Sequence, residues 1–261
     1  MKIATWNVNS VRARLPHLQQ WLAEAAPDVV LLQETKSKEE NFPHHEISAC
    51  GYHSAHYGQP SYNGVAILAK TAPTDVVCGN PHRPQDPQAR IIAATVAGVR
   101  LLSVYVPNGQ AVDSEKYNYK LEWLADFSTY LSSLPENTPV VAGGDYNIAP
   151  AAADIFDAEE WGEGILASVA ERAALQQLFA NGYADAHRLF TQEENVFSWW
   201  DYRAAAFRRN RGLRIDLILV NKLAAARSIS CVPDVEPRRW ERPSDHTPVV
   251  LTLSATAATA K

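Results

Sequence analysis

The chain has 261 residues, of which 46 % are hydrophobic, and it carries a formal net charge of −5. This apolar content suffices for a large buried core and excludes disordered, collagen-like and low-complexity classes of protein. No apolar run approaches the roughly 18 residues of a membrane-spanning helix, and the first residues resemble a strand rather than a signal peptide. The three cysteines (Cys50, Cys78 and Cys231) have unrelated spacings, which favours a reduced, cytoplasmic protein over a disulfide framework or a zinc site.

Apolar patterns along the chain predict strands and helices in turn. Expected strands cover residues 3–8, 29–34, 64–69, 90–96, 100–106, 140–142, 215–220, 229–232 and 249–253. Expected helices cover residues 12–26, 114–134 and 168–181, with Pro27 after the first and Gly182 after the last. Residues 151–164 are expected to form a surface loop and residues 255–261 a frayed tail. Many strands, few helices and no linker favour a single α/β domain over residues 1–254, with two packed sheets and helices outside.

Charge is unevenly distributed along the sequence. Residues 200–242 hold ten Arg and Lys against five Asp and Glu, whereas the remaining residues hold 14 basic and 24 acidic ones. A basic segment on an acidic body is compatible with a polyanion that docks on one face. A solvated arginine-rich loop explains the charge alone equally well.

Several expected strands end in polar residues, which are costly in a core unless they are paired or bind a metal. If these strand ends meet at one sheet edge, they bring together four carboxylates, two carboxamides, a phenol and an imidazole. Each residue could instead cap a turn locally, as Asp and Asn usually do, but that explanation suits one residue better than all eight. The set is Asn7, Glu34, Tyr105, Asp145, Asn147, Asp216, Asp245 and His246.

Such an oxygen-rich set suits Mg²⁺, or Mn²⁺ in its place, rather than zinc. With His246 and Asp145 as proton-transfer groups, the chemistry that fits is metal-assisted hydrolysis of a phosphate ester. The sequence contains no Gly-x-Ser-x-Gly elbow, and Gly143 and Gly144 lack the residues of a dinucleotide or P-loop fingerprint.

Five segments carry a more specific signal: TWNVN (5–9), LQETK (32–36), YVPNG (105–109), GDYNIA (144–149), and RID (214–216) with PSDH (243–246). In this order they resemble the exodeoxyribonuclease III family of DNA-repair nucleases, within the deoxyribonuclease I-like endonuclease/exonuclease/phosphatase superfamily. FSWWDYR (197–203) and NRGL (210–213) resemble its DNA-repair branch. The resemblance implies an α/β fold, a four-layered sandwich of two packed, mainly antiparallel or mixed β-sheets flanked by helices.

The resemblance also implies how the metal and the attacking water are held. Glu34, with Asn7 nearby, would hold the divalent metal against the scissile phosphate. Asp145 would orient or deprotonate the attacking water, and Asn147 would help to position it. Asp145, Asn147 and Asp245 would be ligands in schemes with one metal or two.

The remaining residues are implied to act on the phosphate. His246 would contact it, held by Asp245 on its other ring nitrogen. Tyr105 would donate a hydrogen bond to a phosphate oxygen or to the leaving group. Asp216 would support the site by hydrogen bonding, with His246 as one partner.

The family resemblance implies a Mg²⁺-dependent phosphodiesterase on double-stranded DNA with 3′ ends, nicks, gaps or abasic sites. Its implied activities are 3′→5′ exodeoxyribonuclease, 3′-end processing and apurinic/apyrimidinic endonuclease. We expect a monomer without a membrane partner. A basic candidate for DNA contact could also be an ordinary surface charge, except Arg203 and Arg211, which lie in the motif-like segments. The candidates are Arg12, Lys36, Asn108, Lys116, Lys120, Trp199, Arg203 and Arg211.

The sequence departs from the abasic-endonuclease pattern at two positions. Leu213 stands where members specialised for abasic sites carry a Trp, and Leu166 is expected near the pocket for an extruded sugar. We therefore expect 3′-end processing with weak incision at abasic sites. Two other functions fit the same scaffold: a lipid or inositol phosphoesterase, and a non-catalytic nucleic-acid-binding regulator. The aromatic and arginine-rich segment argues against the first, and the complete set of eight polar residues argues against the second.

Overall fold

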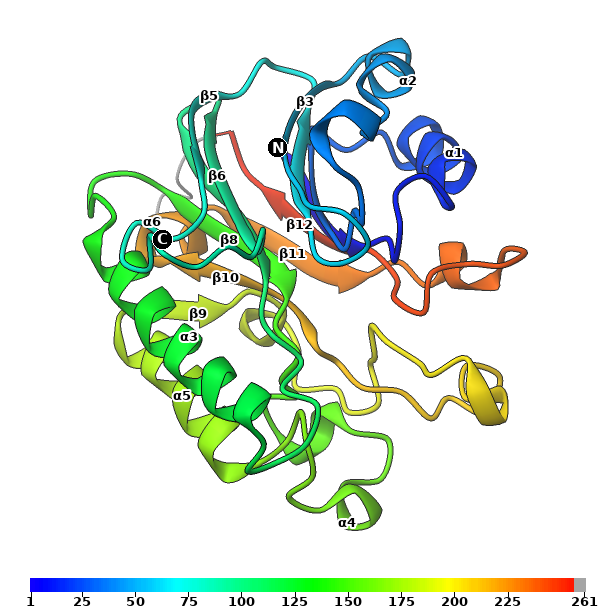
Figure 1. The fold of residues 1–261 in the computed structure, drawn as a ribbon, viewed down its shortest axis with the longest axis vertical. Coiled ribbons are helices and arrows are strands. Elements are labelled where there is room, and N and C mark those ends of the chain that lie inside the picture. Colours follow the sequence, from blue (N-terminus) through cyan, green and yellow to red (C-terminus); the bar gives the residue numbers. More distant parts are fainter. Residues whose placement is uncertain (256–261) are drawn as a thin grey trace.

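The computed structural model describes residues 1–255, so the expected tail at residues 255–261 lies, apart from Ala255, outside the described residues. Two six-stranded sheets pack face to face, and helices cover the outer face of each (Figure 1). Both sheets combine parallel and antiparallel pairs. The predicted four-layered α/β sandwich is confirmed.

The first sheet is built around the strand nearest the N-terminus. Its order is β11 (Ser228–Pro233), β12 (Val249–Leu253), β1 (Lys2–Asn7), β2 (Val29–Gln33), β4 (Val65–Ala69) and β3 (His53–Tyr57). Strand β1 runs parallel to β2 and antiparallel to β12. Helices α1 (Leu15–Ala25) and α2 (His44–Ala49) pack on its outer face.

The second sheet has the order β5 (Thr74–Cys78), β6 (Ile91–Val96), β7 (Val99–Tyr105), β8 (Val140–Asp145), β10 (Asp216–Asn221) and β9 (Tyr183–Asp185). Its parallel pair is β7 and β8. The long helices α3 (Glu115–Ser133) and α5 (Val169–Ala180) cover its outer face, opposite α1 and α2 in Figure 1. Two one-turn helices, α4 (Ala158–Trp161) and α6 (Lys222–Ala225), complete the fold.

Alternation along the central strands produces three layers of core. Ile3 and Ile218 face each other's sheet and belong to the cluster between the sheets. Their neighbours point the other way, because successive side chains of a strand lie on opposite faces. Ala4 packs toward α1 and α2, and Leu217 packs toward α3 and α5. A strand buried on both faces needs a continuous apolar run, which is why these strands were predictable from the sequence.

Gly144 allows β8 to lie close to β7. A Cβ atom built on Gly144 would lie 1.9 Å from the backbone oxygen of Val104. A side chain at this position would push the strands apart, so Gly144 sets the position of Asp145, the next residue along β8.

Several predictions need correction. Strands β3, β5 and β9 and helix α2 were not expected, and residues 151–164 contain α4 rather than only loop. The expected ends of the long helices are confirmed: the Ser114 side chain caps α3, and Gly182 follows α5 with a φ of +90°.

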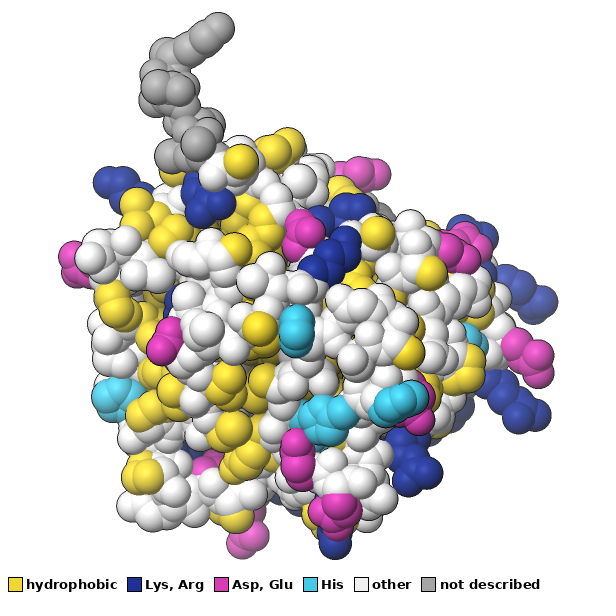
Figure 2. Space-filling model, turned by 90° about the horizontal axis from the view of Figure 1, so that it is seen from above, with side chains coloured by type: hydrophobic (Ala, Val, Ile, Leu, Met, Phe, Trp, Pro, Cys, Tyr) yellow, Lys and Arg dark blue, Asp and Glu magenta, His cyan; other side chains and the backbone are white. Residues whose placement is uncertain are grey.

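The described surface is mixed in character. On the face seen from above in Figure 2, acidic and basic side chains are interspersed among hydrophobic ones. Within residues 1–255, no helix has both the length and the hydropathy that a bilayer crossing requires.

Candidate active site

The predicted polar residues lie at one end of both sheets. Asn7 is the last residue of β1, and Glu34 directly follows β2. Tyr105 and Asp145 end the parallel strands β7 and β8 and are paired in register. Asp216 begins the antiparallel strand β10 opposite Asp145. The carboxyl ends of parallel strands meet at one edge, so the strand order brings these residues together.

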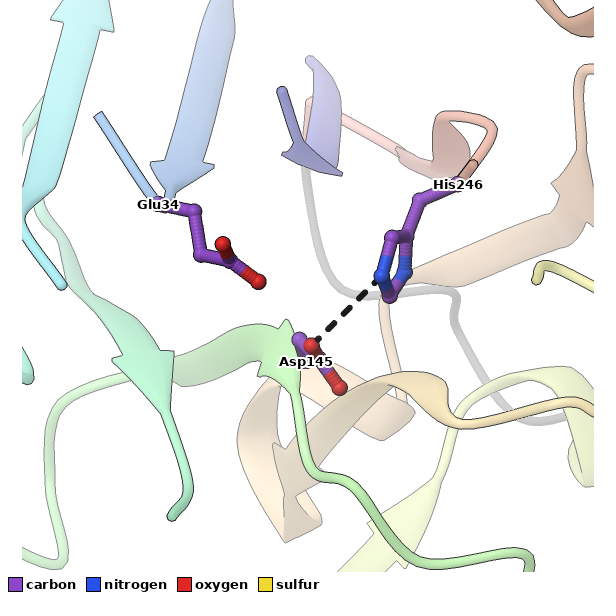
Figure 3. A group of neighbouring side chains, drawn as sticks. All are labelled: Glu34, Asp145 and His246. Atoms are coloured by element: carbon purple, nitrogen blue, oxygen red, sulfur yellow. Dashed lines mark ion pairs between the residues drawn. The ribbon is translucent and has the colours of Figure 1, made fainter. Parts of the chain in front are cut away.

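Three side chains converge at the centre of this edge. Glu34, Asp145 and His246 each offer a ligand atom, and these atoms all lie within 4.8 Å of one another. They point toward a common space from separate segments (Figure 3). His246 Nε2 lies 3.8 Å from Asp145 Oδ2, and both side chains are almost fully buried.

Three neighbours fix the Glu34 carboxylate. Tyr105 donates its hydroxyl to Glu34 Oε1 at 3.0 Å, and Lys36 Nζ lies 2.8 Å from Oε2. Asn7 Nδ2 donates to Glu34 Oε1 at 2.8 Å and to Asp145 Oδ2 at 2.9 Å. Asn7 therefore bridges the two carboxylates through its amide nitrogen.

Of the two partners that the sequence implied for His246, Asp216 is found and Asp245 is not. Its Nδ1 lies 2.9 Å from Asp216 Oδ2, whereas Asp245 accepts hydrogen bonds from Trp199 Nε1 at 3.0 Å and Asn9 Nδ2 at 2.9 Å. The prediction that Asp245 holds the imidazole is wrong, and Asp216 takes that role. Both carboxylate oxygens of Asp245 are engaged by Trp199 and Asn9, and Asp216 takes the Nδ1 position of the ring.

Asn147 lies beside the central group with its side chain already engaged. Its Nδ2 donates to the Val106 oxygen at 3.0 Å, and its Oδ1 accepts from Asn108 Nδ2 at 3.1 Å. Its backbone has a φ of +49° and donates to Asp145 Oδ1 at 2.9 Å. These contacts fix the loop after β8.

The expectation that Lys120 contacts DNA is wrong, because its side chain is fully buried. Its Nζ donates to the backbone oxygens of Asn108 (3.2 Å) and Asn147 (2.7 Å) and pairs with the buried Glu171. Through these hydrogen bonds, Lys120 connects the loop that carries Asn108 to the loop that carries Asn147.

The surroundings of Glu34 and Tyr105 shift their pKa values in opposite directions. Burial on its own would raise the pKa of Glu34, but the Lys36 ammonium and the Asn7 hydrogen bond outweigh it and hold the pKa below its usual value. Burial, together with the adjacent Glu34 charge, raises the pKa of Tyr105 well above its usual value. The phenol therefore keeps its proton and remains a hydrogen-bond donor.

The pKa values of Asp145 and His246 are both raised. Burial raises the pKa of Asp145, and the Asp216 and Glu34 charges add to this, although His246 opposes it. Burial alone would lower the pKa of His246, but the charges of Asp216 and Asp145 outweigh it and raise the pKa. The imidazole is consequently a cation at neutral pH and faces the carboxylates.

The central group fits a hard divalent cation. Mg²⁺ prefers oxygen ligands and is commonly held by one or two carboxylates, and crowded carboxylates lose their mutual repulsion when a cation lies between them. Glu34 and Asp145 are the residues that would hold the ion. Asn7, Asn147 and Asp245 remain predictions as ligands, because their side chains bond to other protein groups here.

Most of the other candidates for DNA contact lie at the surface around this edge. Arg12 and Lys116 are exposed, and the side chain of Arg203 is 90 % exposed. Lys36 is half-buried against Glu34, and Arg211 pairs with Glu160. Their role in binding remains a prediction.

The aromatic segment divides between core and site. Trp200 is buried against Phe197, whereas Trp199 lies 6.5 Å, ring to ring, from His246. Beside Trp199, Leu166 and Leu213 are buried in one apolar cluster with Ile155, Ile215, Ala149 and Ala167.

The sequence reasoning missed Asn9. Its Oδ1 accepts from Lys36 Nζ at 2.6 Å while its Nδ2 donates to Asp245 Oδ1 at 2.9 Å. The available signal was its place in the TWNVN segment (5–9), which is one of the segments that carry the family resemblance.

Comparison with known proteins agrees with this geometry. Residues 4–246 match the model of the endonuclease/exonuclease/phosphatase family, so the chain belongs to this family of enzymes. It is 36 % identical to Exodeoxyribonuclease III of Haemophilus influenzae, over 95 % of this chain and 98 % of that protein. It is 29 % identical to Exodeoxyribonuclease of Bacillus subtilis, over 97 % and 100 % of the two chains. Within the family it therefore groups with the exodeoxyribonuclease III proteins, as the sequence motifs predicted.

Three solved structures are similar over nearly the whole chain. The 3′-5′ exonuclease NExo from Neisseria meningitidis is 45 % identical with a TM-score of 0.95, covering 97 % of this chain and 100 % of that one. Another structure of NExo, described as a 3′ phosphatase bound to product DNA hairpin, has the same identity and TM-score, over 97 % and 99 % of the two chains. An AP endonuclease from Archaeoglobus fulgidus is 37 % identical with a TM-score of 0.93, covering 97 % and 99 %.

Proposed function

We propose that this protein is a divalent-metal-dependent DNA-repair nuclease that removes nucleotides and phosphates from 3′ ends in duplex DNA, with Mg²⁺ as its ion. One observation carries the proposal: Glu34, Asp145 and His246, from three separate segments, bring ligand atoms within 4.8 Å of one another. The similarity to Exodeoxyribonuclease III and to a 3′-5′ exonuclease also described as a 3′ phosphatase supports the reaction and the substrate.

The side chains have complementary roles in this reaction. A Mg²⁺ ion held by Glu34 and Asp145 would supply charge neutralisation and Lewis-acid polarisation of the phosphate. Tyr105 holds Glu34 in place through its 3.0 Å hydrogen bond. The imidazolium of His246 attracts a phosphate oxygen, and Asp216 fixes the ring through Nδ1. Asp145, between these groups, accepts a proton from the attacking water.

We also propose that incision at abasic sites is weak. An extruded sugar needs an open pocket beside the scissile phosphate. Leu166 and Leu213 are buried in the apolar cluster that packs against Trp199, and Leu166 is 5 % exposed, so we expect them to restrict the room for a sugar beside Trp199. The bulky side chain of Leu166 lies on a backbone with a φ of +72°, which favours glycine over leucine.

A nicked duplex with a labelled 3′ end tests the main proposal. Wild-type protein with Mg²⁺ should shorten the strand, and EDTA should stop the reaction. Glu34→Gln should slow it by at least about 10²-fold, because a group that neutralises developing charge is lost. Glu136→Gln, at an exposed position of the α3–β8 turn, is the matched control. Cleavage that survives EDTA or Glu34→Gln contradicts the proposal, and binding without cleavage indicates a non-catalytic regulator.

An abasic duplex tests the second proposal. Wild-type incision at the lesion should be far slower than exonuclease digestion. Leu166→Gly should raise incision about tenfold relative to exonuclease activity, since glycine relieves the backbone strain and opens the pocket. Wild-type incision that matches the exonuclease rate would show that the cluster does not obstruct the sugar.

A further inference from the structure

A groove without acidic residues leads away from the active site. It has a volume of about 670 Å³ and shares Tyr105 and Asn108 with the site. None of the described residues that line it is acidic, although the whole chain carries a net charge of −5. Its outer part is lined by residues 59–63, residues 88–90 and the start of α3. We call it the amide groove after three of its side chains, Gln59, Asn63 and Gln88.

Hydrogen bonds fix the orientation of these three amides. Gln59 Oε1 accepts from the Ala89 backbone nitrogen at 2.8 Å, and Gln88 Oε1 accepts from Arg90 Nε at 2.8 Å. A backbone N–H and a guanidinium N–H can only donate, so the oxygen of each glutamine amide, and not its nitrogen, must face them. Asn63 Nδ2 then bridges the same two oxygens at 3.2 and 3.1 Å. The acceptor atoms of both glutamines are therefore occupied within the protein.

The donor atoms of the two glutamines remain free. Neither Gln59 Nε2 nor Gln88 Nε2 has a partner among residues 1–255, and neither is a buried unsatisfied atom, so both are open to solvent. Gln59 lines no other described cavity, so its free amide belongs to this groove. The exposed Lys116 adds a positive charge at the wall. Such a lining offers hydrogen-bond donors and cations, and no carboxylate to repel an anion.

The position of the groove identifies the part of the substrate that it meets. The Arg90 guanidinium lies 4.9 Å from the centre of the Tyr105 ring and donates to the Tyr105 backbone oxygen at 3.3 Å. The groove wall therefore contacts the residue whose hydroxyl holds Glu34. We expect a strand whose scissile phosphate lies at Glu34 and Asp145 to continue into this space, because Tyr105 and Asn108 line the groove. Its phosphate oxygens are acceptors with negative charge, which the free amides match.

We propose that the amide groove holds the phosphodiester backbone of the strand beside the scissile phosphate, with Gln59 and Gln88 as donors. This inference rests on the proposed nuclease function. Two neutral glutamines orient the strand by hydrogen bonds and contribute little to counterion release, in contrast to Lys and Arg contacts.

Gln59→Glu is a sharp test, because glutamate keeps an oxygen for Ala89 and Asn63 and replaces the free donor with a negative oxygen. Gln59→Glu should raise the KM for a 3′-labelled nicked duplex about tenfold, with a smaller change in kcat, and should weaken binding measured in EDTA to a similar extent. Gln85→Glu adds the same charge nearby on an exposed position outside the groove and is the matched control. Thermal unfolding of both variants verifies that the fold is kept.

Neutral phosphates then distinguish a backbone contact from a base contact. Methylphosphonates are introduced one at a time on either side of the cleavage point, and the penalty of Gln59→Glu should disappear at one or two positions. A penalty that persists at every position assigns the groove to base edges and overturns the proposal. Equal effects of Gln59→Glu and Gln85→Glu on an active enzyme overturn it as well. A wild-type protein that cleaves no duplex instead contradicts the nuclease function itself.

Discussion

At the scale of single residues, the contact between His246 and Asp216 determines the charge that a phosphate meets. Asp216 accepts from Nδ1 at 2.9 Å, so Nε2 faces Asp145 and the space beside Glu34. The carboxylate raises the pKa of His246 and keeps the ring cationic. The family resemblance had implied both Asp216 and Asp245 as partners of His246, and only the fold shows that Asp216 alone accepts from Nδ1.

Asp216→Asn should lower kcat about 10- to 100-fold, as expected when the partner that orients an imidazole is lost. Without the negative charge the pKa of His246 falls, so the ring loses its proton at a lower pH. The alkaline limb of the pH–rate profile should therefore move to lower pH. Asp75→Asn, at an exposed position of β5, should change neither quantity. An unshifted alkaline limb would show that His246 is not the group that titrates there.

Asp145→Asn should stabilise the metal-free protein at pH 8 while abolishing cleavage. Folding raises the pKa of Asp145, so its contribution to stability is present below the unfolded pKa of about 4 and is lost as pH rises through the folded value. The amide avoids the buried charge at pH 8. The Tm should rise by a few degrees, since ~1 kcal/mol corresponds to roughly 2–4 °C at this size. The difference should vanish near pH 4, and a lower Tm at pH 8 would contradict this account.

At the scale of elements, the strands missed by sequence analysis share one property. Strands β3, β5 and β9 are all edge strands, at the ends of their sheets. An edge strand pairs on one side only and tolerates polar residues, so HSAHY in β3 and TDVVC in β5 show no long apolar run. The central strands are buried on both faces, and their apolar runs made them predictable. The candidate site was predictable for the same reason, because polar residues at the ends of such runs stand out.

Beneath the site, Lys120 of α3 and Glu171 of α5 connect the helix layer to the catalytic loops. Both side chains are fully buried, and Glu171 also accepts from Ser168, at the start of α5, and from Leu166. In the sequence, Lys120 cannot be told from a surface lysine, because only the fold shows that it is buried beside Glu171.

Glu171→Gln should destabilise the protein by about 3 kcal/mol, because it leaves a buried ammonium without its charge partner. Urea unfolding measures this loss. A double variant, Lys120→Met with Glu171→Leu, should recover only part of it, because it removes the unpaired charge but leaves the backbone groups bonded to Lys120 and Glu171 without partners. A single variant that costs less than about 1 kcal/mol would show that the backbone oxygens of Asn108 and Asn147 suffice for Lys120.

At the scale of the whole molecule, metal binding and stability should be linked. An ion that binds only the folded state stabilises it by about 2.7 kcal/mol at 100 times its Kd. Adding Mg²⁺ should therefore raise the Tm of the wild-type protein, and EDTA should reverse the rise. The Tm of Glu34→Gln should respond much less, whereas that of Glu136→Gln should respond as the wild type does. A rise of equal size in Glu34→Gln would place the ion elsewhere.

The pairing of β1 with β12 has a consequence for synthesis. β1 lies between β2 and β12, so one edge of β1 stays open until residues 249–253 have been made. A ribosome that has added 200 residues holds a nascent chain with Asn7, Glu34 and Asp145, but without Asp216 and His246. The polar residues of the candidate site are therefore together only after His246 has been made, and a fragment that ends before this residue lacks part of the site.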